Sequence, residues 1–346
     1  MVTEEKQQRK DYFEQGASYQ LAVASNQVPV SRNLRPETSD PAELNGIIII
    51  DKPGDMSSAK AVATVKRLLN AKKVGHTGTL DPFAHGVLVC CVNRATRLAQ
   101  FLLHGEKKYV ATLKLGEETD TQDSTGTIVA VSDLMDLSDK AIQAAFNRFT
   151  GSIEQLPPVY SALKHKGVPL YKLARRGQPF QKQPRHVYIS DIHIREINIP
   201  IVEFEVTCSA GTYIRTLCAD IGRSLGCGGH LQALQRVESS GFTIDQAASL
   251  TELEESASAG HVTNLMISMT DALGDMPAHI ADQQLIGRIR HGMRLTQTDL
   301  KPERRVSGIT HPQPYIKIVD SRDNLIAVLE YTKGKNQLNY CCVLSA

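Results

Sequence analysis

The chain has 346 residues, enough for two domains and a sizeable core, and its hydrophobic (41%) and charged (22%) fractions are those of ordinary globular proteins. Its net charge of +2 is nearly neutral, so only the distribution of charge along the chain can argue for a nucleic-acid partner. No run of eighteen apolar residues predicts a transmembrane helix, and the polar start "MVTEEKQQRKDYFEQ" is not a secretory signal. The seven cysteines form no CxxC pair and no zinc spacing, which favours reduced thiols, a cytoplasmic location and no metal site.

The first part of the chain is expected to be a tail followed by a strand and a helix. Residues 1–44 are polar and lack a sustained apolar period, so we expect them to be flexible. In "NGIIIIDKP" an apolar run meets an Asp-Lys-Pro-Gly turn, which predicts a buried strand that ends there. Ser57 or Ser58 can then cap a helix that runs to about Asn70.

The middle of the chain mixes strand and helix patterns. "KKYVATLKLG" alternates with the period of a strand, and "VEFEVTCSAGTYIRTL" is a second alternating strand, followed by a helix to about Leu225. Between them Ser138 begins a helix that Gly151 is expected to end. The regular spacing of a doubly wound sheet is absent, so we predict an α+β fold.

The hydrophobic pattern of the sequence changes near residue 275. Short apolar runs, "YIKIVD" and "LIAVLEY", are separated by turn residues, and helical periodicity is weak. We therefore expect a large domain at 45–255, a linker near 256–275 and a small β-domain with a helix at 275–346.

A stretch of the large domain, residues 161–189, is rich in basic residues and contains no acid. Tyr171, Phe180 and Tyr188 are interleaved with its cations. The cations are Lys164, Lys166, Lys172, Arg175, Arg176, Lys182 and Arg185. Basic side chains neutralise phosphates and aromatic faces stack on unpaired bases, so an insertion at about 160–190 is predicted to bind folded RNA rather than to be a solvated loop.

One carboxylate stands alone in "GHTGTLDPFAHGVL". Asp81 follows a segment, 56–80, that holds five lysines and arginines but no Asp or Glu. By spacing alone, an Asp-Pro step favours a helix cap over a chemical reagent. Nucleotide-binding, serine-hydrolase and zinc-protease motifs are absent, so no cofactor is expected.

The same stretch strongly resembles the catalytic motif of the TruB-type pseudouridine synthases, G-H-x-G-x-L-D-P-x-A-x-G-x-L. Four more segments resemble that family in the family's order: "DKPGDMSS", "KKYVATLKLGEETDTQDSTG", "QLPPVYSALKHKGVPLYKLARRG" and "CSAGTYIRTLCADIGRSLGCGGHLQALQR". The resemblance spans residue 45 to about 240, and the C-terminal stretch is similar in position and texture to a PUA-type RNA-binding domain. One departure is His85, where the family usually has Ser or Thr, and we expect it to be tolerated.

The resemblance implies that Asp81 is the catalytic carboxylate of an isomerisation that needs no cofactor. The N1–C1′ bond of uridine breaks, the base turns, and a C1′–C5 bond forms. Attack on C1′, attack on the pyrimidine ring and assistance to a glycal all remain open. An attacking carboxylate must be ionised, so a cationic partner that lowers the pKa of Asp81 is expected.

Further residues match the family's substrate positions: Tyr109, Tyr213, Arg215, Leu234 and His76. Arg215 is implied as the cationic partner, with Tyr213 on its face if the segment is extended. Tyr109 matches the tyrosine that stacks on the target base, with a role in removing the C5 proton left open. Leu234 matches an apolar wall of the pocket, and His76 a contact to RNA near the everted nucleotide. Lys52 and Pro53 resemble a structural turn nearby.

The substrate implied by the resemblance is uridine-55 in the TΨC arm of tRNA, everted from its stack. The compact length and the lack of a lysine-rich tail favour the stand-alone bacterial kind over the guide-RNA branch of the family. We expect a monomer without an obligate protein partner. A non-catalytic RNA-binding or tRNA-folding protein, a nucleosidase and a synthase acting on another RNA are the alternatives.

Overall fold

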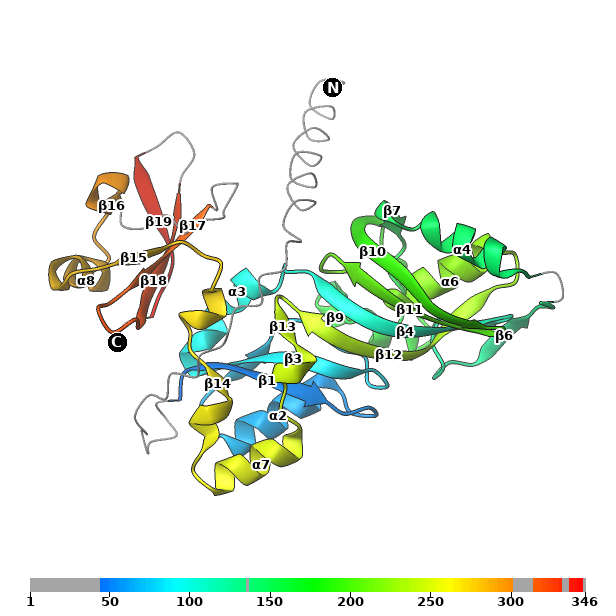
Figure 1. Cartoon of the computed structure of the whole chain (residues 1–346), viewed down its shortest axis with the longest axis horizontal. Helices are drawn as coiled ribbons and strands as arrows, with labels where there is room; N and C mark the ends of the chain where they lie inside the picture. Colours follow the sequence, from blue (N-terminus) through cyan, green and yellow to red (C-terminus); the bar gives the residue numbers. More distant parts are fainter. Residues whose placement is uncertain (1–43, 135–136, 301–313, 332–335, 345–346) are drawn as a thin grey trace. The chain divides into compact units, whose positions relative to one another are not determined.

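The computed structural model describes residues 44–134, 137–300, 314–331 and 336–344, so the expected N-terminal tail lies outside the described residues. The described chain forms two compact units that divide between Ala272 and Leu273 (Figure 1). Each unit has its own hydrophobic core. No described helix combines the length and the apolar character needed to cross a membrane.

The larger unit is built on one mixed sheet. Across the sheet its strands are β14 (Met266–Ile267), β1 (Gly46–Lys52), β3 (His85–Val92), β12 (Gly229–Ser239), β4 (Lys107–Leu115), β11 (Ile201–Cys208), β10 (Arg185–Asn198) and β7 (Gly151–Gln155), with β2 (Val74–His76) paired to β3 and β13 (Phe242–Thr243) paired to β12. Among these described strands, β3 and β12 pair in parallel, and the other pairs are antiparallel. The prediction of an α+β fold is confirmed.

Two pairs of helices pack against different halves of this sheet (Figure 1). The described helices of this unit are α2 (Ser58–Leu68), α3 (Ala99–Leu102), α4 (Asp139–Asn147), α5 (Leu170–Ala174), α6 (Ile214–Ser224) and α7 (Leu250–Ser258). The 3-10 turns of the described chain are η2 (Asn93–Leu98), η3 (Ile244–Gln246), η4 (Val262–Leu265), η5 (Asp271–Leu273) and η6 (Gln297–Asp299). Helices α2 and α7 cover β1 and β3 over one core, whereas α4 and α6 cover β4, β10 and β12 over another. The parallel β3–β12 pair joins the two halves.

Local sequence signals explain most of these elements. Strand β4 alternates buried and half-buried residues along its whole length, as its sequence predicted. Ser57, not Ser58, caps α2 by accepting a hydrogen bond from the Lys60 amide. Helix α4 ends at Asn147, before the expected stop at Gly151, because Gly151 instead opens β7. All seven cysteines are free, and five of them are buried.

The segment expected to be a linker, 256–275, belongs largely to the larger unit. It contains β14, which pairs with β1 in the main sheet, and η4, whose Val262 is buried in the core beneath α7. Strand β14 has two residues, which is too short for an alternating pattern to reveal it.

Two small hairpins project from the larger unit. The expected insertion contains β8 (Lys164–His165), β9 (Val168–Pro169) and α5, and is therefore partly ordered rather than wholly irregular. The other hairpin pairs β5 (Glu117–Thr119) with β6 (Ile128–Val131).

In its described residues the smaller unit is a β-domain with one α-helix, as its sequence predicted. Its sheet has the order β15 (Ala278–Ile280), β17 (Tyr315–Val319), β18 (Leu325–Tyr331), β19 (Gln337–Val343) and β16 (Leu295–Thr296). Helix α8 (Gln283–Arg290) is capped by Asp282 and buries Leu285, Ile286 and Ile289 in the same core as β17 and β18. This core contains no described residue of the larger unit.

Candidate active site

Asp81 lies in the loop between β2 and β3, at the edge of the sheet core. The residues after it form a bend rather than a helix, so the prediction of a helix cap at Asp81 is wrong. A third of the Asp81 side chain (33%) is exposed, so this residue is only partly buried.

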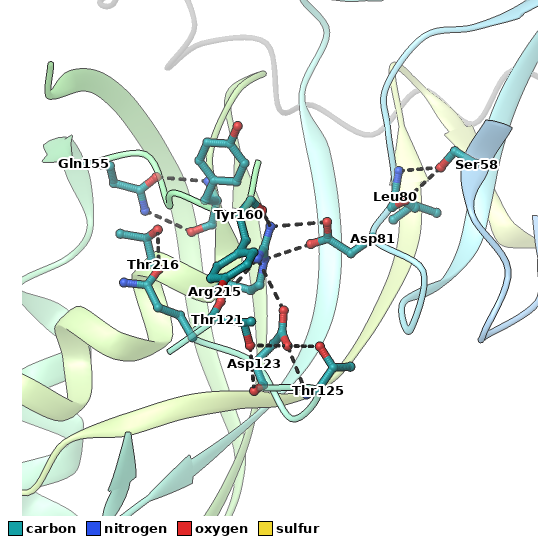
Figure 2. A network of polar contacts seen from close by, with 12 residues as sticks. Ser58, Leu80, Asp81, Thr121, Asp123, Thr125, Gln155, Tyr160, Arg215 and Thr216 are labelled. Carbon is teal, nitrogen blue, oxygen red and sulfur yellow. Dashed lines mark hydrogen bonds and ion pairs between the residues drawn. The ribbon is translucent and has the colours of Figure 1, made fainter. Parts of the chain in front are cut away.

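The backbone on both sides of Asp81 is fixed by side chains of the "DKPGDMSS" segment. The Ser58 hydroxyl donates to the Leu80 carbonyl and accepts from the Leu80 amide, each at 2.8 Å (Figure 2). On the other side, the Lys52 ammonium donates to the Pro82 carbonyl at 3.2 Å. Lys52 is fully buried, and its burial lowers its pKa to about 8, opposed by the nearby negative charge of Asp81. The turn that includes Lys52 therefore holds Asp81 in place.

Arg215 reaches Asp81 from the first turn of α6. Its Nε lies 2.9 Å from Asp81 Oδ2, and its Nη2 donates to Oδ1 at 3.3 Å (Figure 2). The Nε contact is an ion pair without hydrogen-bond geometry, since this buried nitrogen has no hydrogen-bond partner in the described chain. The expectation of an extended segment here is wrong: Tyr213 is the N-cap of α6, and Arg215 is already helical. Carboxylates are favourable at a helix N-terminus, so α6 and Arg215 both attract Asp81.

Asp123 is a second carboxylate on Arg215 that the sequence analysis missed. Its Oδ2 lies 3.3 Å from Arg215 Nη1, and both side chains are 5% exposed. Its Oδ1 accepts hydrogen bonds from the Thr121 hydroxyl and from the amide and hydroxyl of Thr125 (Figure 2). The Thr- and Ser-rich turn around Asp123 was the available signal, because short polar side chains of this kind order a carboxylate locally.

Arg215 thus contacts two carboxylates, that of the partly buried Asp81 and that of the buried Asp123. Two carbonyls complete its coordination, Thr121 O at 3.2 Å from Nη1 and Tyr160 O at 3.0 Å from Nη2. With this many partners the guanidinium is held in one orientation, with its charge directed at Asp81.

The pKa of Asp81 is raised above its ordinary value. Burial of the carboxylate is the main cause; Arg215 opposes it, and the negative charge of Asp123 adds to it. Arg215 therefore lowers the pKa of Asp81 as expected, but does not bring it below the ordinary value.

Tyr213 is positioned by a buried amide and covered by a cation. The Gln155 side chain accepts from the Tyr213 amide at 3.0 Å and donates to the Tyr213 carbonyl at 3.1 Å. The Arg185 guanidinium lies 4.6 Å from the centre of the Tyr213 ring. The structure therefore brings Arg185 to Tyr213, which lies two residues before Arg215 in the chain.

Tyr109 and Leu234 lie in the same core cluster as Leu80, the neighbour of Asp81. Tyr109 is 7% exposed, and its burial raises the pKa of its phenol. A phenol with a raised pKa stays neutral near neutral pH, which suits a stacking surface better than a phenolate base.

His76 is the last residue of β2, directly before the Asp81 loop. Its Nδ1 accepts from the Gly78 amide at 3.2 Å, and burial followed by the charge of Arg236 lowers its pKa. His76 is thus neutral near neutral pH. His85 is exposed at the start of β3.

Most basic residues of the insertion are displayed to solvent. Lys164, Lys166, Lys172, Arg175 and Arg176 are exposed, whereas Arg185 is half-buried. Within the described chain none of these six forms an ion pair with a carboxylate. The described residues also contain no group of three or more His, Cys, Asp and Glu that could hold a metal ion.

Family models match most of the larger unit. The TruB family pseudouridylate synthase (N-terminal domain) model matches residues 66–214, and the tRNA pseudouridylate synthase B C-terminal domain model matches residues 215–272. The first match contains Asp81, Tyr109 and Asp123, and the second begins at Arg215.

Curated relatives and solved structures are similar to this chain over most of its length. The chain is 44% identical to the tRNA pseudouridine synthase B of Geobacter sulfurreducens, over 75% of this chain and 85% of that protein. It is 40% identical to the protein of the same name from Francisella philomiragia, over 84% of this chain and 93% of that protein. Its fold is similar to that of a chain in the crystal structure of a Cbf5-Nop10-Gar1 complex, with a TM-score of 0.68 and 27% identity, over 87% of this chain and 85% of that chain. It is also similar to a chain in the crystal structure of an archaeal box H/ACA sRNP Nop10-Cbf5 complex, with a TM-score of 0.65 and 26% identity, over 87% of this chain and 86% of that chain. The extent of these matches, together with the ordered motifs around Asp81, shows that the chain belongs to the TruB family of pseudouridine synthases.

Proposed function

We propose that this chain isomerises uridine-55 in the TΨC arm of tRNA to pseudouridine, with Asp81 as the catalytic carboxylate. The observation that carries the proposal is the partly exposed Asp81 carboxylate held 2.9 Å from the buried Arg215 guanidinium. The names of the relatives from Geobacter and Francisella support tRNA as the substrate. The reaction is an isomerisation: the N1–C1′ bond breaks, C5 bonds to C1′, and the proton from C5 leaves while N1 gains one.

The uridine has to leave its stack to reach Asp81, which costs a few kcal/mol that contacts to the enzyme must offset. Tyr109 is proposed to stack on the everted base, with Leu234 as an apolar wall and Tyr213 beside it. Arg215 keeps Asp81 ionised and oriented. His76, neutral and half-buried beside the loop, is proposed to contact RNA without transferring a proton.

The insertion is proposed to bind the tRNA backbone. Its exposed cations carry no paired carboxylate among the described residues, so they remain available to phosphates. Arg185, which covers the Tyr213 ring, is proposed to bind nearer to the reacting uridine than the others. The small C-terminal β-domain is proposed as a second, PUA-like RNA-binding domain, and the protein as a cytoplasmic monomer without an obligate partner.

The proposal is tested with an unmodified tRNA transcript labelled in its uridines. We expect pseudouridine at position 55, no free uracil, and no conversion in a transcript that carries cytidine there. Asp81→Asn should abolish conversion and leave tRNA binding measurable, because it removes the carboxylate without changing the side-chain volume.

Other outcomes identify the alternatives. Release of free uracil would make the protein a nucleosidase, and tight tRNA binding without conversion would make it a binding or folding protein. Conversion at another uridine would correct the substrate position. Normal turnover by Asp81→Asn would remove Asp81 from the catalytic role.

A further inference from the structure

Arg236, in β12, is a buried cation that the proposed mechanism does not use. It is 1% exposed and heads the largest fully buried side chains of the described chain. Within that part of the chain, no carboxylate forms an ion pair with it. A buried charge without a counter-charge is costly, so its presence needs a reason beyond packing.

The hydrogen bonds of Arg236 join both ends of the loop that carries Asp81. Its Nε donates to the Val87 carbonyl at 2.7 Å, and its Nη2 donates to the Gly78 carbonyl at 3.0 Å. Gly78 precedes Asp81 and Val87 follows it, so one guanidinium holds the two ends of this loop together. The planar fork of arginine can span two such carbonyls, whereas a lysine ammonium is a single point of charge.

The backbone of Arg236 fixes the same loop relative to Tyr109. Arg236 is paired with Gly86 of β3 on one side and with Tyr109 of β4 on the other. The approach to Gly86 is close: Gly86 has φ +101°, and a Cβ there would lie 2.3 Å from the Arg236 carbonyl oxygen. Strand β12 is therefore locked between the Asp81 loop and the strand of the stacking tyrosine.

We propose that Arg236 is a positioning residue that sets the distance between Asp81 and Tyr109. The proposal rests on the aspartate mechanism above. Arg236 is buried, and it acts through the loop of residues 78–87 and through Tyr109, with which it also shares a side-chain hydrogen bond. Its charge also opposes the rise in the pKa of Tyr109 and lowers that of His76, which places it electrostatically beside both residues.

Arg236→Lys is the variant for the test, and Lys317→Met is its control. Lys317 is also a buried cation held by a carbonyl, that of Leu273, and both of these residues belong to the smaller unit. Both variants are measured for thermal unfolding, for backbone hydrogen exchange, for tRNA affinity and for the single-turnover rate of pseudouridine formation.

We expect Arg236→Lys to accelerate hydrogen exchange at residues 78–87 and to lower the single-turnover rate by about 100-fold, the scale of a small misplacement of reacting groups. The tRNA affinity should stay nearly unchanged, because the variant alters the chemical step and not the RNA surface. Lys317→Met should leave exchange in the loop and the single-turnover rate close to those of the parent protein.

Unchanged exchange in the loop, or a rate loss no larger than that of Lys317→Met, would overturn the proposal. The exchange measurement does not depend on the reaction. If the parent protein formed no pseudouridine in tRNA, the proposed function would fail, while exchange in residues 78–87 would still decide whether Arg236 holds the loop.

Discussion

At the scale of single residues, neighbouring groups have opposing effects on the pKa of Asp81. Burial and the charge of Asp123 raise its pKa, and Arg215 lowers it. A carboxylate must be ionised to act as a nucleophile, so the reaction depends on pH in a way that these neighbours determine.

The single-turnover rate is predicted to fall as the pH is lowered through the pKa of Asp81, because protonation neutralises the proposed catalytic carboxylate. The midpoint of this fall should lie above the ordinary value of about 3.9 for Asp. Asp123→Asn removes a negative charge that raises this pKa, so the midpoint should move to lower pH. A pH–rate profile of both proteins checks the sign, and a shift to higher pH would contradict it.

The sequence motifs predict Asp81, Arg215 and Tyr109 as site residues, and the structure brings Asp81 and Arg215 into contact. The motifs do not single out Asp123 or Arg236, although both lie within them. Asp123 and Arg236 act through contacts to residues distant in the chain, and no local pattern records which carbonyl or guanidinium a side chain meets after folding.

At the scale of elements, two adjacent serines have different tasks. Ser57 caps α2, whereas Ser58 holds the Leu80 backbone with two hydrogen bonds directly before Asp81. The sequence could not choose between them as caps, since both are equally good cap residues.

This pair makes a matched test. Ser57→Ala should lower stability by about 1 kcal/mol, as the loss of a helix cap does, and leave the single-turnover rate nearly unchanged. Ser58→Ala should lower the single-turnover rate because the Asp81 loop loses its anchor. Chemical unfolding and single-turnover kinetics are measured on both variants; equal rates would show that the Ser58 contacts do not position Asp81.

The insertion is the element whose charge is most exposed. Arg175→Ala combined with Arg176→Ala is predicted to weaken tRNA binding and to reduce the slope of log affinity against log salt by about 0.7–0.9 for each phosphate that the variant no longer neutralises. Arg148→Ala, an exposed arginine after α4, serves as the control. A slope that stays unchanged in the double variant would exclude these arginines from the interface.

Strands with clear alternation, such as β4, were predictable, whereas two other elements were not. The Asp-Pro step at Asp81 looks like a helix start, but there the chain bends into β3. Arg215 looks like part of a strand, but β11 ends at Cys208 and the motif continues into α6. In both places tertiary contacts of the site override the local preference of the sequence.

At the scale of the whole molecule, the two units have separate cores, and every side chain of the candidate site lies in the larger one. A protein ending at Ala272 is therefore predicted to unfold cooperatively and to form pseudouridine in tRNA with a raised KM and a similar kcat. Calorimetry and steady-state kinetics test this. Failure of the shortened chain to fold would show that the larger unit needs residues 273–346.

The parallel β3–β12 contact pairs only Gln235 with His85 and Arg236 with Gly86 among the described residues, although it unites two much broader halves of the sheet. Because so few residues pair there, we expect this seam to open in mild denaturant before the longer strand pairs on either side of it, once the hydrogen bonds of Arg236 to Val87 and Gly78 are lost. If the halves parted there, the loop bearing Asp81 would separate from the half bearing Arg215, and activity would vanish while most strands kept their partners. Loss of function would then precede loss of circular-dichroism signal during gentle denaturation.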